Sequence, residues 1–290
     1  MSGEHHGDGR ARESGPHHVS QPSTTTAWTR AAFAAIVLLS AAQVAAGPLE
    51  DATAAYARGD YATVLRLLRP LADQGHAPAQ ARLGFAYANG EGVPRSQFEA
   101  AKWYRLAADQ GDVSAQNNLG VMYTKGEGVP KNHAEAVKWY RLAADQGHAD
   151  AQSNLGNMYR NGEGVPRSHA EAVKWYRLAA DQGHASSQRT LGVMYRKGEG
   201  VPQNHAEAVK WVRLAADQGH APAQGILGIA YHNGEGVPQD YVRAHMWFNL
   251  SAAQGDKDAA QYRDRISKRM TSAQIAEAQK LASEWQAKRR

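Results

Sequence analysis

Two series of histidines repeat along the chain and are the first residues to consider for metal or acid–base chemistry. The first series is His133, His169 and His205, and the second is His148, His184 and His220. Zinc ligands must all lie about 2.0–2.1 Å from one ion. Equivalent positions of stacked helices lie about 8–10 Å apart, so neighbouring members of a series cannot share a metal. We therefore expect these histidines to cap or contact helix ends, and we predict no metal site and no cofactor.

The other side chains that could perform catalysis do not form a known constellation. A serine acylase of the β-lactamase type requires Ser-x-x-Lys, and no serine in this chain has a lysine three residues later. The zinc motif H-E-x-x-H is also absent. Glutamates such as Glu127, Glu163 and Glu199 occur once per repeat and are not paired across a cleft. The sequence predicts that the protein is not an enzyme.

The elements that carry these residues recur with a period of 36 residues. Glutamine marks the period at Gln80, Gln116, Gln152, Gln188 and Gln224. Glycine and tryptophan follow the same step, at Gly84, Gly120, Gly156, Gly192 and Gly228, and at Trp103, Trp139, Trp175, Trp211 and Trp247. A fixed period of about 20–50 residues indicates a solenoid. Each unit must then bury its apolar face against its neighbours.

The first half of each unit reads as an amphipathic helix. Leu119, Met122 and Tyr123 recur at helical spacing and form one apolar face. Gly120 lies in the interior of this helix, where glycine costs about 1 kcal/mol relative to alanine. A glycine that recurs at this position indicates close approach of a partner helix. Gly126 is placed to end the helix in the left-handed conformation.

The second half of each unit also reads as a helix. Asn132 with Glu135 predicts a capping box, in which the glutamate side chain bonds back to the N-cap N–H. Gly147 is placed to end this helix. Tryptophans of the apolar stripe should face the neighbouring repeat, and we expect Trp139 and Trp175 to be largely buried. Each unit is thus predicted to be an αα-hairpin.

These motifs resemble a known family. The pattern LG-x-x-Y, GEGVP and A-x-x-W-Y-x-x-A-A-x-Q-G, read from Leu119 to Gly147, resembles the Sel1-like repeat, a relative of the tetratricopeptide repeat. Five full copies occupy 77–256. The resemblance implies an all-α fold, a right-handed superhelix of antiparallel helix pairs whose first helices line a concave face that binds proteins or peptides.

The resemblance also keeps a second function open. Some exported Sel1-like proteins are linked to β-lactam binding, which implies, as an alternative, an envelope hydrolase or ligand-binding protein acting on cell-wall or β-lactam-like molecules. One exported subgroup joins each repeat with a disulfide, and this chain departs from that subgroup because it has no cysteine.

The segments outside the repeats have distinct compositions. Residues 1–29 are rich in polar residues and are predicted to be disordered. Residues 30–46 resemble a signal peptide cleaved after Ala46, which predicts a periplasmic or secreted protein with no stable membrane span after cleavage. An uncleaved membrane anchor is the alternative, although the sixteen-residue run Ala31–Ala46 would span only about 24 Å as a helix. We expect an N-terminal capping hairpin over 47–76 and capping helices over 257–290, with a capping box at Thr271 and Gln274.

The partner-binding residues are predicted from variation inside the array. Positions seven residues apart share a face of a helix, and two such first-helix positions change from repeat to repeat. The resemblance adds Asn118 and Asn154, which match an asparagine that holds a peptide backbone in tetratricopeptide relatives. The predicted partner-binding residues are Asn117, Asn118, Thr124, Asn154, Arg160, Arg189, Arg196 and His232. Their arginines suit a protein or peptide that is acidic or has a free C-terminus. The net charge of +5 is spread along the chain and does not predict nucleic-acid binding.

Overall fold

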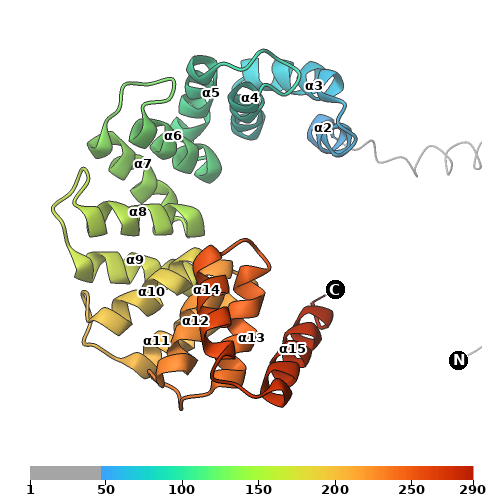
Figure 1. Cartoon of the computed structure of the whole chain (residues 1–290). Helices are drawn as coiled ribbons and strands as arrows, with labels where there is room; N and C mark the ends of the chain where they lie inside the picture. Colours follow the sequence, from blue (N-terminus) through green and yellow to red (C-terminus); the bar gives the residue numbers. More distant parts are fainter. Residues whose placement is uncertain (1–46, 290) are drawn as a thin grey trace, which may run out of the picture. The chain divides into compact units, whose positions relative to one another are not determined.

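The computed structural model describes residues 47–289, and in this part of the chain all regular structure is α-helical. The predicted signal peptide and polar tail lie outside the described residues. Within Pro48–Arg290, which forms one unit, the helices follow one another along a curved path (Figure 1). In this view α6, α10 and α12 lie nearer the hollow side of the curve than α7 and α11.

The helices form consecutive antiparallel pairs. The first pair is α2 (Pro48–Ala57) and α3 (Tyr61–Asp73). The five repeats follow as α4 (Ala77–Asn89) with α5 (Gln97–Asp109), α6 (Val113–Lys125) with α7 (His133–Asp145), α8 (Ala149–Asn161) with α9 (His169–Asp181), α10 (Ala185–Lys197) with α11 (His205–Asp217), and α12 (Ala221–Asn233) with α13 (Tyr241–Ala252). Two further helices, α14 (Lys257–Ser267) and α15 (Ser272–Ala287), end the array. The all-α solenoid predicted from the period is confirmed.

In the five repeats, the first helices end at left-handed glycines, and all but α4 begin at a side-chain cap. His148 accepts a hydrogen bond from the Ala151 N–H through Nδ1 at 3.3 Å. His184 and His220 cap α10 and α12 in the same way. Gly126 ends α6 with a φ of 77°, as predicted. The histidines of this series are therefore helix caps, which is one of the two roles expected for them.

Of the two hydrogen bonds in the capping box predicted for the second helices, only one forms at Asn132. Asn132 does accept the Glu135 N–H at 3.1 Å. Its own N–H, however, donates to the Tyr123 carbonyl of the preceding helix at 2.9 Å, so no donor remains for the glutamate. The Glu135 carboxylate instead binds the Lys138 ammonium. A reciprocal capping box does form at the start of α15, between Thr271 and Gln274.

The recurring mid-helix glycines mark where the two helices of a repeat touch. A Cβ atom added to Gly120 would lie 2.6 Å from Cδ1 of Tyr140 on α7, closer than van der Waals contact permits. In the next repeat the corresponding pair is Gly156 and Tyr176, where the closest approach would be 2.9 Å. The close approach predicted from the sequence is confirmed.

The tryptophans of the stripe are buried to different degrees. Trp139 is buried, with 9% of its surface exposed, as expected. Trp175 is partly buried and packs against the apolar cluster that contains Tyr140 and Leu155. Burial of the stripe at the contacts between repeats is therefore less complete at Trp175 than at Trp139.

A glutamine in each first helix joins three helices. Gln116 donates its side-chain amide to the Ala108 carbonyl at the end of α5, at 3.2 Å. Its Oε1 accepts the amide of Gln146, the C-cap of α7, at 2.8 Å. The same pair of bonds is made by Gln80, Gln152, Gln188 and Gln224. Buried amides that are fully bonded in this way fix the register between neighbouring repeats.

The last helix leaves the repeat pattern. Trp285 of α15 meets Trp247 of α13 edge to face, with ring centroids 5.9 Å apart. Arg289 donates to the Gln218 carbonyl at the end of α11, at 2.6 Å. Leu250, which belongs to the core cluster that α15 joins, is 1% exposed, whereas its counterpart Leu214 is 43% exposed. The helix α15 therefore closes the apolar end of the array. Within 47–289, no helix is long and apolar enough to span a membrane.

Candidate functional site

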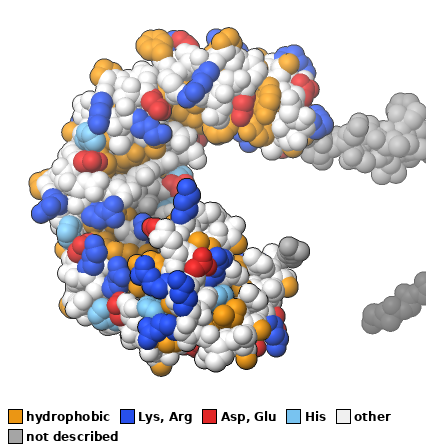
Figure 2. All heavy atoms as spheres, viewed as in Figure 1, with side chains coloured by type: hydrophobic (Ala, Val, Ile, Leu, Met, Phe, Trp, Pro, Cys, Tyr) orange, Lys and Arg blue, Asp and Glu red, His pale blue; other side chains and the backbone are white. Residues whose placement is uncertain are grey.

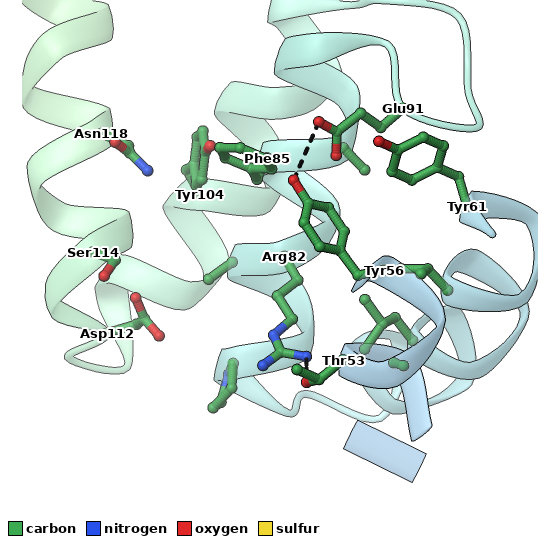
Figure 3. A pocket seen from close by; sticks show the side chains of 16 residues that line it. Thr53, Tyr56, Tyr61, Arg82, Phe85, Glu91, Tyr104, Asp112, Ser114 and Asn118 are labelled. Atoms are coloured by element: carbon green, nitrogen blue, oxygen red, sulfur yellow. Dashed lines mark hydrogen bonds between the residues drawn. The ribbon is translucent and has the colours of Figure 1, made fainter. Parts of the chain in front are cut away.

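A cavity of about 470 Å³ opens among the helices α2, α4 and α6. Its lining side chains come from these helices, from α3 and α5, and from the α4–α5 turn (Figure 3). The volume lies within the range of about 300–1,000 Å³ that is usual for ligand sites. Because α4 and α6 are first helices, the cavity lies on the face that the sequence predicts for partner binding.

The walls of the cavity are aromatic and apolar. Phe85 and Tyr56 line it, and 43% and 44% of their surfaces are exposed. Tyr104 from α5 lies beside Phe85 (Figure 3) and is buried. Exposed aromatic side chains that face one cavity provide apolar area for a partner to cover.

Polar groups surround these walls. Arg82 donates through Nη1 to Thr53 Oγ1 at 2.6 Å and to the Leu49 carbonyl at 3.3 Å, which fixes the guanidinium against α2. The Tyr56 hydroxyl lies 3.4 Å from Glu91 Oε1. Desolvation, followed by the Glu91 charge, raises the pKa of Tyr56.

Asn118 and Asp112 complete the side of the cavity formed by α6. Asp112 is the N-cap of α6 and accepts the Ala115 N–H at 2.8 Å. Burial raises the pKa of Tyr104, and the neighbouring Asn118 amide opposes that rise. Of the eight predicted partner-binding residues, Asn118 is the one that lines the cavity.

Asn117 and Asn154 lie together at the boundary between two repeats. The Asn154 side chain donates to Asn117 Oδ1 at 3.0 Å. Asn117 is only 8% exposed, so it offers a partner little surface. Thr124 is also engaged, since its hydroxyl donates to the Gly120 carbonyl at 2.9 Å and lies 3.1 Å from the Tyr140 hydroxyl.

The predicted arginines lie further along the first helices. Arg160 stands 5.9 Å from the centre of the Tyr176 ring. Burial raises the pKa of Tyr176 to about 12, and the charges of Arg160 and Arg189 oppose that rise. Both guanidinium groups therefore lie near one tyrosine. Arg160, Arg189 and Arg196 are all partly exposed, and none forms an ion pair within the described residues.

His232 connects this row of arginines to the end of the array. Its ring lies 5.4 Å from that of Tyr241. Burial, then Arg269 and Arg265, lower the pKa of His232. These two arginines belong to the end of the chain beyond the repeats, where the period gives no signal. Figure 2 shows lysine and arginine side chains gathered over the part of the array that contains α10 to α14.

Comparison with known proteins gives the family. The family model described as Sel1 repeat matches residues 77–112, 113–148, 149–184, 185–220 and 221–256. The chain belongs to the Sel1-repeat family.

Two solved Sel1-type structures share the fold of this Sel1-repeat chain. A protective antigen of uropathogenic Escherichia coli strains, described as displaying an SLR fold, is 40% identical over 78% of this chain with a TM-score of 0.71. The match spans 48% of that antigen, about half its length. A Sel1 repeat protein from Oxalobacter formigenes is 35% identical, with a TM-score of 0.71, over 76% of this chain and 88% of that one. Comparison with curated proteins finds no match.

Two residues of the cavity differ in type from the residues at the same position in the other repeats, and this difference could have indicated the cavity. Phe85 occupies a position that holds Val121, Asn157, Val193 and Ile229 in the other repeats. Arg82 occupies the position of Asn118, and it breaks the asparagine pattern that guided the sequence prediction. The missed residues were thus visible as exceptions within the period. In the part of the chain that the structure describes, no group of three or more His, Asp or Glu residues is placed to hold a metal ion.

Proposed function

We propose that this Sel1-repeat protein is a scaffold that binds a protein or an extended peptide through the face carried by its first helices. The observation that carries the proposal is the cavity between α2, α4 and α6, where Phe85 and Tyr56 remain exposed. Large exposed apolar groups in a concave, polar-rimmed site favour binding of a partner. Sel1 repeats typically mediate protein interactions, which agrees with this role.

The spacing of the first helices suits an extended chain. Packed helices lie about 8–10 Å apart, and an extended peptide covers that distance in about three residues. A partner running along the array would therefore place about one side chain in three against each repeat. Asn118 is partly exposed on this path and presents an amide that can bond to a peptide backbone.

The charges along the path favour an acidic segment in the partner. Arg160 on α8 and Arg189 and Arg196 on α10 carry guanidinium groups on two successive first helices, and Arg265 and Arg269 extend the cations onto the end of the array. Planar guanidinium groups bind carboxylates in bidentate fashion. Because these groups are partly exposed, their contribution should depend on ionic strength.

We further propose that the scaffold acts in the periplasm or outside the cell. Arg30, the apolar run that follows it, and the small residues Val44 and Ala46 support a signal peptide. N-terminal sequencing of protein recovered from the envelope fraction should begin at Gly47. Protein that keeps residue 1 and sediments with membranes would favour an uncleaved anchor instead.

Capture of a partner from an envelope extract tests the proposed function. Wild-type protein and the double variant Arg160→Ala with Arg196→Ala are immobilised side by side. We expect a protein retained by the wild type to be lost from the variant. The matched control is Lys138→Ala with Lys174→Ala, which removes two exposed cations from second helices. Equal capture by all three proteins would exclude the first-helix arginines from partner binding.

A further inference from the structure

The cavity between α2, α4 and α6 exposes an aromatic ring at a first-helix position where the other repeats carry valine, asparagine or isoleucine. Phe85 and Arg82 both depart from the repeat pattern, and both line the cavity. Tyr56, the second exposed aromatic ring, comes from the helix pair that precedes the five repeats. The site is therefore assembled only where α2 packs beside the first Sel1 repeat.

The aromatic groups leave room for a bulky side chain. Figure 3 shows Phe85 and Tyr56 facing the same space, with Tyr104 behind Phe85. The Tyr56 hydroxyl donates to Glu91 at 3.4 Å, and its ring meets that of Tyr61 edge to face with centroids 5.7 Å apart, so the ring lies on the wall of the cavity. The volume of about 470 Å³ exceeds what a single side chain needs, so part of the adjoining backbone can enter as well.

The charges at the cavity favour a cation beside that side chain. Its charged lining residues are Arg82, Glu91 and Asp112, of which two are carboxylates. Arg82 already donates to two acceptors on α2, Thr53 and the Leu49 carbonyl. Asp112 uses one carboxylate oxygen, Oδ1, as a helix cap. Figure 3 shows Asp112 and Glu91 on opposite sides of the cavity.

We infer that this cavity is the anchor site for a bulky apolar or aromatic side chain of the partner, and that Glu91 and Asp112 select a basic residue next to it. The inference rests on the proposed function, because it assumes that the partner lies along the first-helix face. The inference specifies the residues at one end of the partner, which are an aromatic or branched aliphatic residue and a neighbouring lysine or arginine. The cationic row beyond α8 then meets an acidic segment of the same partner.

Two small probes of equal reach and opposite charge test this chemistry. The probe 2-phenylethylamine carries an ammonium group, and 3-phenylpropionate carries a carboxylate. Each is titrated into the full-length protein, and binding is followed by shifts of the backbone amide signals of Phe85 and Asn118 in NMR spectra. We expect weak binding of the amine, with Kd on the order of 1–10 mM. The amine should bind at least threefold more tightly than the carboxylate.

Three variants locate the binding and separate its components. Phe85→Ala should weaken binding of the amine at least fivefold. The control Phe98→Ala removes a phenyl ring that is 63% exposed outside the cavity, and it should leave the titration unchanged. Glu91→Gln combined with Asp112→Asn should abolish the preference for the amine, since asparagine replaces aspartate as an N-cap at little cost.

The outcomes are distinct. Equal binding of the two probes to the wild type would overturn the charge selection. Absence of binding by either probe, or equal losses in Phe85→Ala and Phe98→Ala, would overturn the anchor site. If a captured partner binds Phe85→Ala normally but requires Arg160 and Arg196, the scaffold function stands and the anchor inference falls.

Discussion

Gln146 donates its side-chain amide to Gln116 at 2.8 Å, and this bond joins the end of α7 to the buried face of α6 in the same repeat. Gln116 in turn donates to the last turn of the preceding helix α5 at 3.2 Å. One buried side chain thus sets the position of three helices. Because the arrangement recurs with the period, it determines how accurately the first helices are placed along the binding face.

Replacing one of these glutamines should loosen the array at that repeat. In Gln152→Ala, the bond to the Ala144 carbonyl and the bond from the Gln182 amide are both lost. Each such hydrogen bond contributes about 0.5–1.5 kcal/mol, and we expect the free energy of unfolding in urea to fall by about 1–3 kcal/mol for the two. Gln182→Ala is the control, since it removes only the second of these bonds, from an exposed side chain, and should cost less. A Gln152→Ala protein as stable as the wild type would contradict this role.

The helix-interior glycines should not tolerate a methyl group. In Gly156→Ala the new Cβ would lie 2.9 Å from the Tyr176 ring, and overpacking of this kind costs about 1–3 kcal/mol. Gly225→Ala serves as the comparison, because its Cβ would meet only two side-chain oxygens, the closer at 3.1 Å. That change gains helix propensity. Thermal melts should show a loss for Gly156→Ala and little change for Gly225→Ala, and equal losses would refute the close-approach explanation.

Truncation of the tryptophans should reveal their unequal burial. Removing a buried aromatic side chain costs about 3–5 kcal/mol, and Trp139→Ala should fall in that range. Trp175→Ala should cost clearly less, since Trp175 is only partly buried. Urea titrations of the two variants measure the difference. Equal costs would show that the two tryptophans contribute alike and would contradict this expectation.

Stability should fall in mild acid. Burial, then Arg189 and His184, lower the pKa of His220 below its usual value of 6.5. The folded state therefore binds fewer protons than the unfolded state below about pH 6.5, and stability present above that pH is lost as the pH falls toward the lowered folded pKa. The pKa values of His232 and His245 are lowered in the same direction, by burial first.

One variant isolates the contribution of the histidine cap. His220→Asn keeps an N-cap acceptor without a titrating group, so its melting temperature should fall less between pH 7 and pH 5 than that of the wild type. His76 is the matched control because it stands at an N-cap without a side-chain hydrogen bond. His76→Asn should retain the wild-type pH dependence. Identical pH profiles for the wild type and His220→Asn would contradict the assignment.

The fold could be predicted from the sequence because local signals repeat in register. Gly126 ends a helix in the left-handed conformation, and Gly120 permits close approach of a second helix. Each of these glycines recurs in all five repeats. Contacts that depend on the packing of one helix against another could not be predicted in this way. The capping box at Asn132 failed because a carbonyl of the previous helix takes the same N–H.

The site was harder to predict for a related reason. Asn118 was identified because it matches an asparagine of tetratricopeptide relatives, and it does line the cavity. Phe85 and Tyr56 were missed because a cavity depends on the packing of α2 beside α4, and the period does not include α2. Asn117 shares a face with variable positions, but its bond to Asn154 across the repeat boundary buries it.

Site-specific photo-crosslinking measures most directly which face binds the partner. A photoreactive phenylalanine replaces Asn118 on a first helix in one protein and Lys138 on a second helix in another, and both are irradiated in the producing cells. We expect a crosslinked partner from position 118 and none from position 138. Crosslinking from position 138 alone, in a protein that remains folded, would place the partner on the second helices and contradict the proposed function.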